Sequence, residues 1–140
     1  MSTLDDLRNR GLIESVDPDR ATAALWLNDA ERHIEAALQI AELDPAGAYV
    51  LAYDAARKSV AAALLMDGHR VLSRPGAHRA LAEYAKSLSS QTGEQALARL
   101  DRLRRNRNRS EYGSRSFGKS EVAEAIDTAR AIRAACAQRT

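Results

Sequence analysis

The residues best suited to chemistry lie in one arginine-rich stretch, Arg99 to Arg115. It holds seven arginines, two acids and no lysine, a net charge of +5. The entire chain carries +2, so the remaining residues carry −3 and the positive charge belongs to this segment. Guanidinium groups bind phosphate oxygens through paired hydrogen bonds, so the stretch predicts a site for phosphates or an acidic partner. The alternative is a solvated helix face with scattered salt bridges.

If this stretch is helical, its spacing places four of its residues on one face. Arg102, Arg105, Arg109 and Tyr112 would share one face of a helix. Such a face could hold a phosphodiester, with the tyrosine ring beside a base. The predicted RNA- or phosphate-binding residues are Arg102, Arg105, Arg107 and Arg109.

Arg107 falls where the apolar stripe of Leu100 and Leu103 would continue. It is therefore expected either to extend its charged end out of the edge of the core or to face a second subunit. Trp26 fits a core or interface position, with a base-stacking platform as the alternative.

Other chemistry has little support in the sequence. His33, His69 and His78 lie in three separate segments, and Cys136 is the single cysteine. We therefore expect no metal site and no internal disulfide. The glycines are isolated and form no phosphate-binding loop, so no cofactor is expected.

The N-terminus lacks the apolar segment of a signal peptide, and no apolar run approaches the length of a membrane span. With a lone cysteine, this predicts a cytoplasmic protein that does not enter the membrane.

The elements that must position the arginines are helices. Alanine is abundant and no alternating β pattern occurs, so the sequence predicts an all-α, up-and-down bundle of four to five helices without strands. Residues 1–16 are expected to form a short helix and arm, and residues 17–140 the bundle. Asp17-Pro18 and Asp44-Pro45 predict helix starts, with Asp as N-cap and Pro at the first helical position.

The first long helix is expected to end near Leu43, and the second, apolar around most of its circumference, to be the most buried. A shorter helix is predicted over residues 77–88, another from Leu97 into the arginines, and a last one capped by Ser120. Tyr49, Tyr53 and Tyr84 fit the buried stripes.

Three segments together resemble the HEPN domain family, helical bundles of prokaryotic toxin–antitoxin and defence systems. They are the alanine-rich helix with Ala52-Tyr53-Asp54-Ala55-Ala56-Arg57-Lys58, the segment Gly76-Ala77-His78-Arg79-Ala80-Leu81, and Arg105-Asn106-Arg107-Asn108-Arg109-Ser110-Glu111-Tyr112. The resemblance covers about residues 17 to 137.

The resemblance implies a homodimer, with active members acting as metal-independent endoribonucleases. Their motif is Arg, four to six residues, then His, and in some toxins a tyrosine follows two positions later. Here Arg105 and Asn106 match its start, Tyr112 matches the trailing tyrosine, and Ser110 takes the histidine's place. In an alternative alignment of the motif, Arg107-Asn108 match its start and Tyr112 takes the position of the histidine.

The missing histidine separates the functional hypotheses. Metal-independent RNA cleavage needs an acid and a base that titrate near neutral pH, which serine cannot supply. The sequence thus favours a dimeric module that binds RNA, a nucleotide or a partner. The first alternative is an endoribonuclease toxin that uses Arg105, Asn106, Ser110 and Tyr112, or that takes its imidazole from His78. In the second alternative, a nucleotidyltransferase antitoxin regulates the protein by adding AMP to Tyr112.

Overall fold

The fold is built around α3, Pro45–Met66, the most apolar helix of the chain. The computed structural model describes residues 2–112 and 116–140, and of residues 110–112 it describes the backbone only. Asp44 caps α3 by accepting a hydrogen bond from the Gly47 amide at 2.9 Å, and Pro45 occupies its first turn, as expected. α3 is buried on most of its sides, which confirms that it is the most buried helix.

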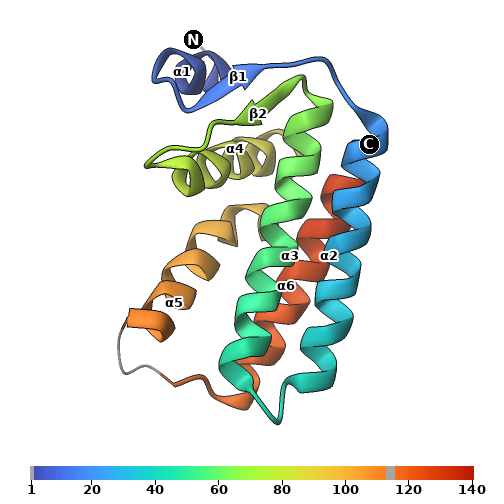
Figure 1. The fold of residues 1–140 in the computed structure, drawn as a ribbon, viewed down its shortest axis with the longest axis vertical. Helices are drawn as coiled ribbons and strands as arrows, with labels where there is room; N and C mark the ends of the chain where they lie inside the picture. The colour runs from blue at the N-terminus through green and yellow to red at the C-terminus, as the bar shows by residue number, and fades with distance from the viewer. Residues whose placement is uncertain (1, 113–115) are drawn as a thin grey trace.

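Two other long helices pack lengthwise against α3 (Figure 1). α2 spans Arg20–Ile40 and runs antiparallel to α3, and α6 spans Lys119–Ala137 and runs in the same direction as α3. Small side chains such as Ala30, Ala52 and Ala56, all fully buried, line the contact surfaces. Because interhelical distance depends on the side chains at the contact, these alanines let the backbones approach closely.

The remaining elements cover one end and one side of this three-helix layer (Figure 1). They are α1 (Thr3–Asn9), β1 (Ile13–Ser15), β2 (His69–Val71), α4 (Ala77–Thr92), the 3-10 helix η1 (Gln95–Arg99) and α5 (Leu100–Tyr112). The architecture is all-α, as predicted, with a minor two-stranded sheet.

That sheet corrects the expectation that no strand would be found. β1 and β2 pair antiparallel, with Ile13 opposite Val71 and Ser15 opposite His69. Each strand has three residues, too few to show an alternating pattern in the sequence. The pairing joins the N-terminal arm to the bundle, and Leu7 of α1 is fully buried.

Several helix ends also differ from the expected ones, and α2 ends at Ile40 rather than near Leu43. α2 begins at Arg20 rather than Pro18, because Asp19 accepts hydrogen bonds from the Thr22 amide and hydroxyl, at 3.0 and 2.6 Å. α4 continues to Thr92 and ends at Gly93, whose positive φ of 80° terminates the helix. At α6 the N-cap is Gly118 instead of Ser120, and Glu121 accepts a hydrogen bond from the Gly118 amide.

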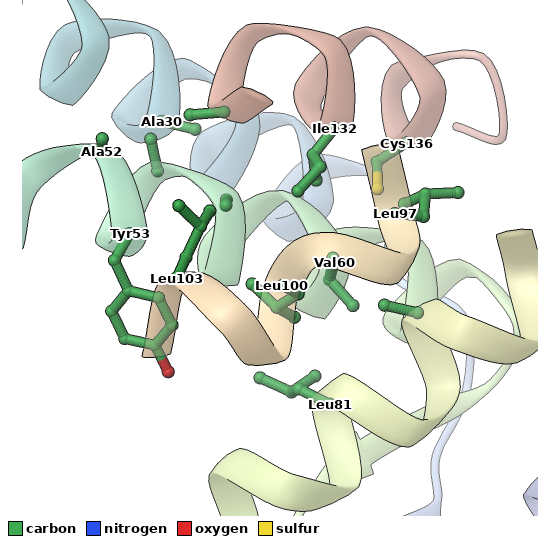
Figure 2. Close-up of a cluster of buried hydrophobic side chains, with 14 of the residues drawn as sticks. Ala30, Ala52, Tyr53, Val60, Leu81, Leu97, Leu100, Leu103, Ile132 and Cys136 are labelled. Carbon is green, nitrogen blue, oxygen red and sulfur yellow. The ribbon is translucent and has the colours of Figure 1, made fainter. Parts of the chain in front are cut away.

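The helix that carries the arginines docks through a leucine stripe. Figure 2 shows Leu97, Leu100 and Leu103 entering the cluster formed with Val60 of α3 and Ile132 of α6. All three leucines are buried, at 1%, 2% and 4% exposure. This stripe fixes which side of α5 faces the core.

We therefore expect Leu100→Ala to lower the free energy of unfolding by about 2–5 kcal/mol, the range for a buried leucine replaced by alanine. Chemical denaturation followed by circular dichroism measures the change. Leu38→Ala is the matched control, because Leu38 is 43% exposed and its loss should change stability by no more than about 0.5 kcal/mol. Equal effects of the two substitutions would contradict this account of α5.

Candidate phosphate-binding face of α5

The exposed side of α5 is formed by arginines. Arg102, Arg105 and Arg109 are exposed, on the side of the helix opposite the buried Leu100 and Leu103. The side chain of Arg105 is 59% exposed. The predicted common face thus exists for these three arginines, while the side chains of Ser110 and Tyr112 lie outside the described residues.

One carboxylate partly compensates this charge. Asp101 accepts two hydrogen bonds from Arg104 at 3.1 and 2.9 Å, and its other oxygen lies 3.1 Å from Nε of Arg105. A single negative charge is therefore shared between two guanidinium groups. Asp101 thus offsets only part of the charge of the arginines described on α5, and the exposed Arg102 and Arg109 favour an anion at this face.

A hollow of about 440 Å³ lies beside this face, between α4 and α5. The charged side chains that line it are Arg10, Arg79, Glu83, Lys86, Asp101, Arg102 and Arg105. Five of these are cations and two are acids, and Arg10 lies 3.0 Å from Glu83. The excess of cations on both walls favours an anionic ligand.

Asn106 lies on a different side of α5 from the exposed arginines. Its amide nitrogen donates a hydrogen bond to the hydroxyl of Tyr49 at 3.1 Å. Tyr49 is 2% exposed, and its ring stacks on Phe117 with centroids 4.2 Å apart. Asn106 is thereby anchored to α3. Within one subunit it is a positioning residue rather than part of the exposed arginine face.

Arg107 is half-buried and extends towards α3. Its guanidinium carbon lies 5.8 Å from the centroid of the Tyr53 ring, within cation–π range. Tyr53 is 2% exposed, which confirms its prediction as a core residue. Within this subunit the guanidinium therefore lies over a buried ring of α3, and the expectation that its charged end extends out of the edge of the core is wrong.

His78 reaches the same tyrosine from α4. Its Nδ1 lies 2.8 Å from the Tyr53 hydroxyl, so His78 and Arg107 flank one aromatic ring. Burial lowers the pKa of His78, and the positive charges of Arg57, Arg107 and Arg104 lower it further. Burial also raises the pKa of Tyr53, which therefore stays protonated. Neutral imidazole is thus the dominant form of His78 near neutral pH.

The sequence did not reveal this cluster. His78 and Tyr53 are 25 residues apart on different helices, and the apolar stripe of its helix predicts only a core position for Tyr53. A hydrogen bond between such positions leaves no local pattern, because it depends on how α4 crosses α3.

Metal and thiol chemistry find no support among the described residues. No group of three or more His, Cys, Asp or Glu side chains there could hold a metal ion. Cys136 is fully buried, and burial raises the pKa of its thiol to about 12, which makes it unreactive.

The HEPN domain family model matches residues 23–139, from the first turn of α2 to the end of α6 and two residues beyond. The chain belongs to the HEPN domain family. No match was found among curated proteins or among solved structures. Within the described part of the chain, no helix of this HEPN domain is long and apolar enough to cross a membrane.

The lowered pKa of His78 predicts a pH dependence. The unfolded chain binds the proton near the ordinary value of 6.5, whereas the folded chain binds it only at lower pH. The free energy of unfolding should therefore fall as the pH decreases through 6.5. His78→Gln should reduce this fall, measured by denaturation between about pH 7.5 and 5.5, above the range where carboxylates titrate. If the free energy of unfolding of the variant falls with pH as steeply as that of wild type, His78 is not the source of this dependence.

Proposed function

We propose that this HEPN domain is a dimeric RNA-binding module of a toxin–antitoxin or defence system, which holds RNA without cleaving it. The observation that carries the proposal is the row of exposed arginines on α5, Arg102, Arg105 and Arg109, beside a hollow whose opposite wall supplies Arg79 and Lys86. Arginines in this arrangement bind successive phosphates of a strand through charge-assisted hydrogen bonds.

The residues at the motif positions support binding over cleavage. Ser110 stands at the position of the motif histidine, and its hydroxyl does not titrate near neutral pH. It therefore cannot serve as the acid or the base of the cleavage reaction. Arg105 is exposed and available to phosphate, while Asn106 is held against Tyr49. The proposed role of Arg105 is therefore to stabilise phosphate charge.

The proposed dimer is supported by the family architecture, in which two copies of the motif helix meet. The exposed arginines of one α5 would repel those of a second copy at short distance unless an anion lay between them. RNA would supply that anion. The dimer and the RNA site are thus proposed to form one surface.

The binding proposal predicts that purified protein retains labelled RNA in a salt-sensitive manner in the presence of EDTA and leaves it uncut. Arg105→Ala should reduce the slope of log affinity against log salt by about 1, the effect of one lost phosphate contact. Arg130→Ala, at an exposed arginine of α6, is the matched control and should leave the slope unchanged. Cleavage in EDTA that Arg105→Ala abolishes would refute the non-cleaving assignment.

A second variant tests the motif itself. Ser110→His restores the missing acid–base group, so we expect it to confer cleavage in EDTA while wild type stays inactive. The double variant with Arg105→Ala should lose that cleavage. If Ser110→His binds RNA as wild type does and still does not cut, the motif assignment of Ser110 is wrong.

The endoribonuclease alternative has one observation in its favour. A neutral imidazole, His78, lies at the Tyr53 ring that also contacts Arg107, so an acid–base group and a cation are close to each other without the motif histidine. Cleavage by wild type that His78→Gln removes would establish this alternative. Addition of AMP to Tyr112 by a co-expressed nucleotidyltransferase would appear as a mass increase that Tyr112→Phe prevents.

A further inference from the structure

The N-terminal arm, residues 2–16, lies outside the part of the chain that the family model matches, which begins at residue 23. The arm contains α1 and β1, and α1 packs against α4, which lies between α1 and α5 (Figure 1). One side chain of the arm, Arg10, lines the basic hollow between α4 and α5. The arm therefore reaches the same surface as the arginines of α5.

The backbone of the arm is fixed on both sides of Arg10. Leu7 and Ile13 are 0% and 3% exposed. The guanidinium of Arg8 lies 2.8 Å from Nε2 of His69 in β2, and the pairing of β1 with β2 holds the residues that follow. Arg10 thus extends from the end of α1 in a position that the core sets.

Arg10 forms ion pairs that join the arm to α4. Its guanidinium donates a hydrogen bond to Asp6 of α1 at 2.9 Å, and it donates to both carboxylate oxygens of Glu83 at 3.2 and 3.0 Å. These three side chains are about half exposed. Exposed ion pairs contribute little to the stability of a fold, so the main effect of Arg10 is expected on the charge of the surface.

Glu83 occupies a position where its charge matters to an anionic ligand. It lines the hollow between α4 and α5, and it also lines a hollow of about 490 Å³ between α1 and α4. Lys86, nearly one turn further along α4, lines both hollows too. A carboxylate without a counter-charge at this point would repel a phosphate in either hollow.

Both acids of the hollow between α4 and α5 are paired with arginines. Asp101 is paired with Arg104 and Arg105 of its own helix, so its compensation is internal to α5. Glu83 is paired with Arg10, so its compensation comes from the arm. The positive character of the α4 wall therefore depends on a residue that is distant from α5 in the sequence.

We propose that the N-terminal arm is part of the RNA-binding surface, with Arg10 as a positioning residue that neutralises Glu83 and keeps the α4 wall attractive to phosphate. The inference rests on the proposed binding of RNA at α5. It adds to that site a segment outside the region that the family model matches.

The test measures the affinity of the full chain for a short labelled RNA oligonucleotide in EDTA. Arg10→Gln should weaken binding about threefold to fivefold at low salt, the scale of one exposed charge interaction, and the loss should shrink as salt rises. Arg10→Lys keeps the charge and should retain most of the affinity. The double variant Arg10→Gln with Glu83→Gln should return to within about twofold of wild type, because no carboxylate is left to compensate.

Arg70→Gln is the matched control. Arg70 also pairs with an acid across the junction of arm and bundle, Glu14 of β1, but it lines a separate hollow bordered by α2, α3, β2 and α4 together with the half-buried Trp26. This variant should bind RNA as wild type does. Circular dichroism verifies that each variant is folded.

The outcomes distinguish this inference from the proposed RNA binding. If wild type retains no RNA, or if Arg105→Ala does not weaken retention, the RNA proposal fails and this inference fails with it. If Arg105→Ala weakens binding and Arg10→Gln does not, the inference alone is overturned. A double variant as weak as Arg10→Gln also overturns it, because Arg10 would then act by direct contact with RNA or only through the fold of the arm.

Discussion

The burial of the leucine stripe of η1 and α5 against α3 and α6 is the interaction on which the candidate site depends. Leu97, Leu100 and Leu103 are almost fully buried, so the rotation of α5 about its own axis is set by the core. Once that rotation is set, Arg102, Arg105 and Arg109 must face outwards. The basic face is therefore a consequence of apolar packing on the other side of the same helix.

α3 provides the second constraint through its tyrosines. Tyr49 and Tyr53 are buried among apolar residues, yet each hydroxyl reaches a polar side chain outside α3. Tyr49 accepts from Asn106 and Tyr53 contacts His78, so the two rings tie α5 and α4 to the central helix. Buried hydroxyls require such partners, because an unsatisfied polar group in the core is costly.

Two hollows on the surface of the HEPN domain differ in their charged and apolar lining. The hollow between α4 and α5 is lined almost entirely by charged groups, which suits a phosphate backbone exposed to solvent. The hollow between α2, α3 and α4 has cations around an apolar wall with an indole. Consecutive residues of α4, His78 and Arg79, line different hollows, so one helix separates the two environments.

The helical class, the central position of the second long helix and the location of the basic segment could all be predicted from the sequence. These follow from local signals: apolar periodicity, the Asp44-Pro45 start and the density of arginines between residues 99 and 115. The sequence also indicated the family through the residues around Arg105 and Asn106. The start of α2 was misplaced by two residues because Asp17 and Asp19 both carry capping side chains, and only Asp19 bonds to Thr22.

The contacts between side chains that are distant in the sequence could not be predicted and depend on the packed fold. The three-residue strands exist because β1 and β2 pair across the chain, and neither has a local signal long enough to predict it. The contacts of His78 with Tyr53 and of Asn106 with Tyr49 join positions 25 and 57 residues apart. Such contacts depend on how the helices cross, which is set by the packing of many side chains at once rather than by any one segment.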